Sequence, residues 1–180
     1  MITNTVAFAI LSGVVGFLAK SLYDLWATRR KERLDRVNQQ LKLLYGPLFA
    51  LNRAGGLAWD AFRTRTRPGG SFFGADPPPT EADLQAWRLW MLTVFHPIHE
   101  EMLSIVTKNA DLLIESELPE PVQLFCAHVA AYKVVFEQWR QHDFRDHASV
   151  LNYPTRELGT YLERSFVGLK AEQAKLLGRW

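Results

Sequence analysis

Cysteine is almost absent from this sequence, in which Cys126 is the single example. No internal disulfide can form, which fits a reducing compartment. Also missing are the glycine-rich phosphate loop, Gly-x-Ser-x-Gly, Cys-x-x-Cys, any internal repeat, and the alternating Val, Ile and Thr runs that predict strands. The sequence therefore predicts an all-α protein and carries no signature of a common catalytic site.

Positive charge is lacking before the first apolar stretch. A cleaved signal peptide needs such charge, so this alternative is disfavoured. The uncharged core from Val6 to Ala19 would be about 21 Å long as a helix, and extension from Ile2 to Tyr23 matches a hydrocarbon slab of about 30 Å. We therefore predict a transmembrane anchor within residues 1–27 rather than a buried core helix. Its apolar side chains are Val6, Phe8, Ile10, Leu11, Val14, Val15, Phe17 and Leu18.

A basic collar follows the predicted span at once and consists of Arg29, Arg30, Lys31 and Arg33. A positive flank on the C-terminal side predicts a bacterial inner-membrane protein with its N-terminus outside and its body in the cytoplasm. Tyr23 and Trp26 would then lie in the interfacial aromatic belt. A collar beside the anionic lipid of the bilayer accounts for much of the net charge of +2, so nucleic acid is not expected as a partner.

Small residues share one face of the predicted span, at Ala9, Gly13 and Gly16. Such a face lets two helices approach closely, so a homo-oligomer is one expectation. The alternative is that glycine and other small residues are simply frequent in membrane helices.

The helix is predicted to continue out of the membrane through residues 28–63. An apolar stripe repeats there at three and four positions: Leu34, Val37, Leu41 and Leu44. We expect this stripe to pack on the protein's own body, with pairing to a second chain as the alternative. Gly46-Pro47 joins two helices in this region and should kink or break the rod, because proline removes one backbone hydrogen bond and clashes with the preceding turn.

Residues 64–79 form a predicted loop rich in proline and glycine. Phe72 and Phe73 lie within it, where they either fold back onto the body or form an interface with a partner. Residues 80–180 return to helical periodicity, and Thr80 with Asp83 predicts a capped helix start. The body is thus predicted to be a kinked bundle of about four to five helices.

Histidine supplies the nearest approach to a ligand site. His96 and His99 lie one turn apart, and His128 on a later helix could supply a third metal ligand. However, His-x-x-His is not the spacing of the helical zinc hydrolases, and Pro97 disturbs this turn. The prediction is therefore no metal, no other cofactor and no catalytic residue.

Three stretches carry a resemblance to known proteins: residues 43–48 with the sequence Leu-Leu-Tyr-Gly-Pro-Leu; His128, Tyr132 and Trp139; and Tyr153-Pro154 leading to Phe166 and residues 169–173. On these stretches the chain resembles a family of bacterial single-span, membrane-anchored helical proteins. That family has no assigned activity, so the resemblance implies a topology and no chemistry.

The leading functional hypothesis is a non-enzymatic accessory or scaffold protein that binds a protein partner, or a larger membrane complex, at the cytoplasmic face. The anchor, the stripe on the exit helix and the content of six Trp and eleven Phe favour it. The first alternative is a sensor whose bundle binds a small ligand or a metal near His96, His99 and His128. The second is a metal-dependent hydrolase that uses the same residues.

Overall fold

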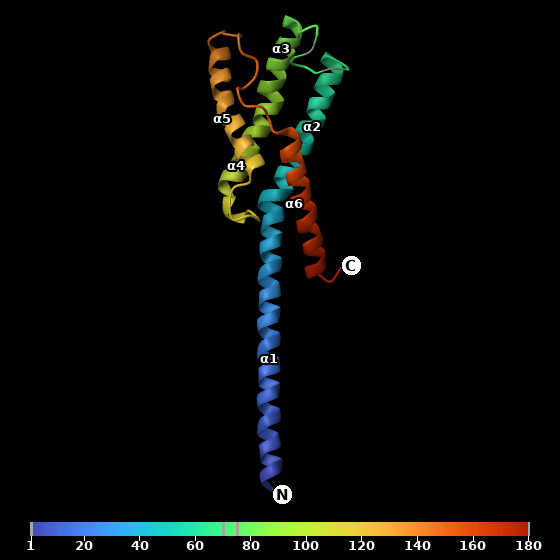
Figure 1. The fold of residues 1–180 in the computed structure, drawn as a ribbon, viewed down its shortest axis with the longest axis vertical. Helices are drawn as coiled ribbons and strands as arrows, with labels where there is room; N and C mark the ends of the chain where they lie inside the picture. The colour runs from blue at the N-terminus through green and yellow to red at the C-terminus, as the bar shows by residue number, and fades with distance from the viewer. Residues whose placement is uncertain (1, 70, 75, 180) are drawn as a thin grey trace.

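The computed structural model describes the backbone of residues 2–69, 71–74 and 76–179, and within these ranges the side chains from residue 16 onward. The described chain is all-α, with four continuous helical rods and no strand, which confirms the predicted class. The first helix, α1 (Ile2–Gln39), projects as a stalk from a body built by the rods at its far end (Figure 1). In chain order the other elements are η1 (Gln40–Tyr45), α2 (Gly46–Thr66), α3 (Glu81–Trp90), η2 (Met91–Phe95), α4 (His96–Lys108), η3 (Ala110–Leu112), α5 (Glu120–Arg140) and α6 (Thr155–Leu176).

Successive rods alternate in direction. The first rod joins α1, η1 and α2, the second joins α3, η2 and α4, and α5 and α6 are the third and fourth. Figure 1 shows α6 returning beside the part of α1 nearest the body. Side chains hold the two helices together there, since Arg33 Nε lies 2.5 Å from Glu172 Oε1 and Arg30 donates to the Leu176 carbonyl.

Two π-helical turns carry the rods past prolines. Proline has no N–H to donate to the carbonyl four residues back. The residue before each proline instead donates five residues back: Gly46 to the Leu41 carbonyl, and His96 to the Met91 carbonyl. The first rod therefore does not break at Gly46-Pro47. Figure 1 shows α2 leaning away from the axis of α1, so the rod bends, which is the predicted kink.

Two groups of buried side chains stabilise the body. The lower cluster surrounds Leu44, Tyr45 and Leu162, which are fully buried, and it includes Val37 with Leu41 packed against it. Three of the four residues of the exit-helix stripe, Val37, Leu41 and Leu44, thus pack on the protein's own body, as expected. The upper cluster is aromatic and contains Phe62, Phe72, Trp87, Phe95, Tyr132, Phe136 and Trp139. The second rod follows the loop that carries Phe72. It begins with the predicted cap, in which Thr80 and Asp83 form hydrogen bonds to each other.

The loop phenylalanines fold back onto the body. Phe72 is 2% exposed, and its ring centroid lies 5.1 Å from that of Phe62. Phe73 is half-buried, with its ring 5.4 Å from Trp87. Neither is presented to a partner in this arrangement, because burying their apolar area in the aromatic cluster is favourable.

The predicted span falls mostly on residues whose side chains are not described. Among the helices of the described part of the chain, none is both long enough and apolar enough to cross a bilayer. Outside the described side chains lie Val6, Phe8, Ala9, Ile10, Leu11, Gly13, Val14 and Val15. Phe17 and Leu18 are exposed on α1, and Gly16 faces open space. Both the span and its helix-pairing face stay predictions.

Candidate ligand-binding cavity

A cavity of about 590 Å³ lies between α2, the rod of η2 and α4, α5, and residues 148–155. Its volume is within the range of small-molecule sites, about 300 to 1,000 Å³. Gly55 and Gly56 on α2 and Gly159 on α6 line it, so parts of the helical wall carry no side chain. The cavity separates the lower and upper clusters, because residues of both contribute to its lining.

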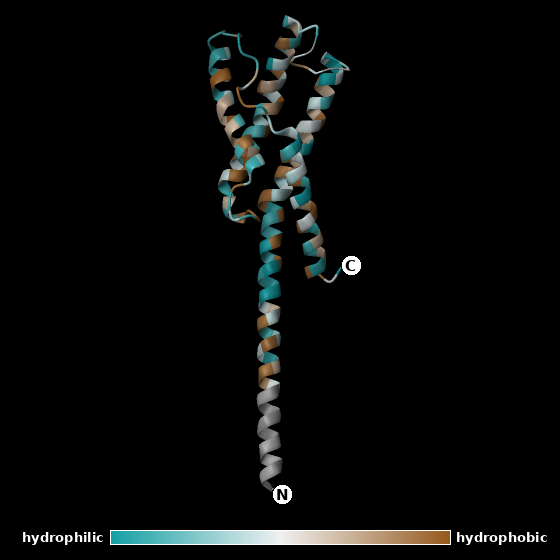
Figure 2. Cartoon of the chain, viewed as in Figure 1, coloured by the Kyte–Doolittle hydropathy of each residue, from teal (hydrophilic) through white to brown (hydrophobic). Residues whose placement is uncertain are grey.

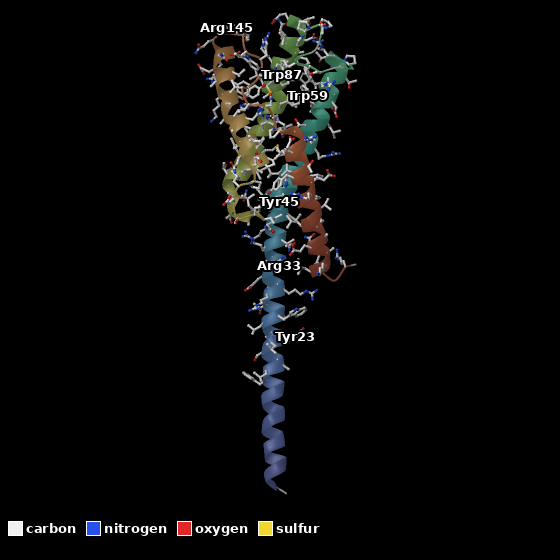
Figure 3. The ribbon with its side chains drawn as sticks, viewed as in Figure 1. Tyr23, Arg33, Tyr45, Trp59, Trp87 and Arg145 are labelled. Atoms are coloured by element: carbon white, nitrogen blue, oxygen red, sulfur yellow. The ribbon has the colours of Figure 1, made fainter. Side chains whose placement is uncertain are left out.

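One part of the lining is aromatic. The Trp59 ring lies 5.8 Å from Trp87 and 6.0 Å from Phe95, edge to face in both cases. Trp87 and Phe95 are themselves 5.8 Å apart. Figure 3 places the two labelled tryptophans side by side in the upper half of the body. Such rings offer apolar faces and edges against which a planar molecule can stack.

The other part of the lining presents histidine and tyrosine rings. The His99 ring stacks on Tyr153 with centroids 4.7 Å apart and an interplanar angle of 17°. His128 lies 5.7 Å from His99 and 5.4 Å from Tyr153. The Tyr153 hydroxyl donates to Asn52 Oδ1 at 2.9 Å, which joins residues 148–155 to α2.

The histidines in the cavity are held neutral. Burial lowers the pKa of His99 to about 3, and the nearby His128 and His96 lower it further. Burial also lowers the pKa of His128, although its hydrogen bond to the Leu151 carbonyl opposes this effect. Both rings are therefore uncharged near neutral pH.

Charge is confined to the exposed part of the lining. Arg53, Asp60 and Glu163 line the cavity and are all exposed to solvent. Burial raises the pKa of Tyr132 and of Tyr153, so their hydroxyls also stay neutral. The inner surface thus combines aromatic faces with uncharged hydrogen-bonding groups, an arrangement suited to an uncharged guest.

Residues 146–151, which we call the strap, close one side of the cavity without forming a helix or strand. Backbone carbonyl groups of the strap accept hydrogen bonds from tryptophan and histidine ring nitrogens. Trp139 Nε1 donates to Asp146 O at 2.8 Å, and Trp87 Nε1 donates to His147 O at 2.6 Å. His128 Nδ1 lies 2.6 Å from Leu151 O. These donors satisfy backbone groups that have no partner in regular secondary structure.

The three predicted candidate ligands do not converge. His99 and His128 share the cavity, whereas His96 packs on Phe136 with ring centroids 4.2 Å apart and lies 3.4 Å from the Glu100 carboxylate. Within the ranges that the structure describes, no three His, Cys, Asp or Glu side chains are grouped to hold a metal ion. That the protein binds no metal stays a prediction.

Cys126 does not line the cavity. It is half-buried against the lower cluster, and burial raises the pKa of its thiol. A thiol with a raised pKa is a poor nucleophile at neutral pH.

No family model, curated protein or solved structure matches this chain. The resemblance to single-span bacterial proteins therefore stays a prediction, and the case for function rests on the cavity.

Several residues of the cavity were missed from the sequence. Gly55-Gly56 gave a signal, because paired glycines inside a helical pattern mark missing side chains or close approach. Tyr153 gave none, since it follows an irregular segment whose path is set by contacts with α3 and α5. Trp59 and Trp87 carry only the signal of aromatic residues on helices that are far apart in the sequence.

Proposed function

We propose that this protein is a membrane-anchored, non-enzymatic receptor whose helical body binds a small, uncharged, largely apolar molecule. The observation that carries the proposal is the cavity of about 590 Å³, with its aromatic rings and neutral histidines. Protein interiors are normally close-packed, because lost contacts destabilise the fold. A retained cavity with a few convergent polar groups is typical of a ligand site. This function corresponds to the sensor predicted from the sequence, without its metal.

The membrane anchor is the second part of the proposal. Large apolar side chains are exposed on α1 in the C-terminal part of the predicted anchor: Phe17, Leu18, Leu22, Tyr23, Leu25 and Trp26. Figure 2 shows hydrophobic positions in this part of α1, interspersed with hydrophilic ones, below a hydrophilic collar. A surface of this kind favours an apolar surrounding. The collar begins at once, with Arg30 over the Trp26 ring at 5.2 Å, as expected where a helix leaves lipid.

Fractionation of cells tests the anchor. The full chain should remain with the membranes after alkaline carbonate extraction, and a C-terminal reporter should be active only in the cytoplasm. Release into the carbonate supernatant would exclude the span, and a reporter active only in the periplasm would exclude the orientation.

Calorimetric titration with naphthalene tests the receptor. The full chain in lipid nanodiscs should bind one naphthalene per chain, above the uptake by empty nanodiscs. Gly55→Leu should abolish this site, because a Cβ at Gly55 lies 3.8 Å from Ile98 across the gap between α2 and α4, so a leucine there enters the cavity. Ala54→Leu, on the exposed side of the same helix, is the matched control. Equal binding by both variants would exclude the cavity as the site.

We further propose that binding of the ligand changes how the protein associates with a protein partner at the membrane, the partner that the sequence predicts. Support comes from connectivity, since α2 lines the cavity and is continuous with α1 through η1. Co-purification from detergent with and without naphthalene should then recover different amounts of the partner. Identical recovery from wild type and Gly55→Leu under both conditions would argue against this coupling.

A further inference from the structure

We infer that the ligand is an uncharged aromatic molecule that carries a hydroxyl group, and that this hydroxyl is hydrogen-bonded between His99 and His128. The inference rests on the proposed function and names the chemical class that the cavity selects. It follows from three features of the lining. The proton of the His128 imidazole is held by a backbone carbonyl, the donor and the acceptor nitrogen of His99 have no partner among the described residues, and aromatic rings line the same cavity.

The proton of His128 is fixed by its partner. Nδ1 lies 2.6 Å from the Leu151 carbonyl oxygen, which can only accept, so this nitrogen carries the hydrogen and donates it. In the neutral ring the other nitrogen, Nε2, then has a lone pair and no proton. Nε2 of His128 is therefore a hydrogen-bond acceptor, and the ligand must supply the donor.

His99 is placed by ring contacts. Its imidazole is stacked on Tyr153 and lies edge-on to Phe125, with centroids 6.0 Å apart, and it makes no hydrogen bond to any described residue. A neutral imidazole has one donor and one acceptor nitrogen. Both are left for a guest in a cavity that this ring lines.

A hydroxyl in the cavity can satisfy both rings, whereas a carbonyl or a carboxylate cannot. It can donate to His128 and accept from His99 at the same time, because both rings line the cavity and their centroids are only 5.7 Å apart. A carbonyl group cannot donate to His128. A carboxylate also lacks the proton, and its charge would be buried without a cationic partner among the inner groups.

The aromatic rings that line the same cavity determine what the rest of the ligand should be. Trp59, Trp87 and Phe95 form mutual contacts at 5.8 to 6.0 Å and line the same cavity. Aromatic pairs prefer offset or edge-to-face packing, and a flat aromatic guest extends this pattern. A phenol or a related aromatic alcohol can hydrogen-bond to the two histidines through its hydroxyl and pack its ring against the aromatic side chains.

Three probes with one ring system test the inference: 2-naphthol, naphthalene and 2-naphthoate, titrated at pH 7 into the full chain in nanodiscs. The Kd for 2-naphthol should be roughly tenfold lower than that for naphthalene, as expected for hydrogen bonds made in a buried site. 2-Naphthoate should bind more weakly than either. This comparison uses the wild-type chain and so does not depend on a variant that folds.

His128→Phe should remove the preference, with the ratio of the two Kd values falling to about one, whatever the Kd for naphthalene itself becomes. His96→Phe is the control, because His96 does not line the cavity, and it should keep the wild-type ratio. Equal wild-type affinities for 2-naphthol and naphthalene, or tightest binding of 2-naphthoate, would overturn the inference and leave the receptor function standing. Absence of binding by all three probes would overturn both.

Discussion

The imidazole of His99 is packed between Tyr153 and His128, and no carboxylate pairs with it among the described residues. Taking up a proton there would place a charge in a poorly solvated site beside two other histidines. The folded state therefore holds the ring neutral, whereas the unfolded chain exposes it to water. This difference links the free energy of unfolding to pH.

Stability should fall in mild acid. The pKa of His99 is about 3 in the folded state against an ordinary value of 6.5, so below pH 6.5 the unfolded state binds more protons. His99 alone should lower the free energy of unfolding by about 2 kcal/mol between pH 7 and pH 5. Urea titrations at the two pH values measure this, and His99→Leu should show a smaller fall. A wild type equally stable at both would contradict the assignment.

Phe72 should contribute more to stability than its place in a loop suggests. Phe72→Ala removes a ring that is 2% exposed and should cost about 3 kcal/mol or more. Phe144→Ala is the matched control, because Phe144 is 40% exposed and its ring contacts the Arg88 guanidinium and the His142 ring outside the aromatic cluster. Its loss should cost about 1 kcal/mol or less. Equal thermal melts of the two variants would show that Phe72 does not belong to the core.

At the scale of elements, the π turns set which side chains meet. The turn at η1 places Gln40 and Tyr45, five residues apart, on the side of the helix that faces residues 112–114. Gln40 donates to the Leu112 carbonyl at 2.9 Å, and the Ile114 N–H donates to the Tyr45 hydroxyl at 3.0 Å. Labelled Tyr45 marks this junction of stalk and body in Figure 3. The second turn, η2, brings Met91 and Phe95 into the cavity wall.

Of two glycines on the first rod, Gly46 and Gly56, only Gly46 should be required. A Cβ at Gly46 would overlap the Leu41 carbonyl oxygen of the π turn, so Gly46→Ala should destabilise by about 1 to 3 kcal/mol. Gly56 has open space for a Cβ, and Gly56→Ala should stabilise by about 0.5 to 1 kcal/mol. Chemical denaturation distinguishes them, and a Gly46→Ala protein as stable as wild type would rule out the π turn.

The strap depends on indole donors. Trp87→Phe keeps an aromatic ring but removes the donor to the His147 carbonyl, so amides of residues 148–151 should exchange with deuterium faster. Trp26→Phe, which is 54% exposed on α1, should leave this exchange unchanged. Unaltered exchange in Trp87→Phe would mean that other contacts hold the strap.

Helices and their faces could be predicted from the sequence, because each depends on local periodicity. The cap at Thr80, the stripe through Val37 and Leu44, and the proline sites were all visible. The π turns were not, since the sequence shows that a proline must be accommodated but not how. The strap was unpredictable for another reason: its hydrogen bonds come from side chains far along the chain.

At the scale of the whole molecule, a stalk leads directly into a body with two cores and a cavity between them. The long first rod connects the exposed apolar part of α1 to the cavity wall at Gly55 without interruption. The sequence predicted the stalk and the bundle. It could not predict the cavity, because its lining comes from four rods and a loop whose packing decides what remains unfilled. The sequence proposed His96, His99 and His128 as one candidate group, of which His99 and His128 line the cavity and His96 does not.

A small aromatic molecule is proposed to occupy this cavity. Crystals of the full chain grown with 2-bromonaphthalene test this proposal, because anomalous scattering locates the bromine. We expect one bromine peak between α2 and α4, within reach of Trp59 and Trp87, and its loss in Gly55→Leu. Bromine found only along α1, or at the same place in both proteins, would contradict it.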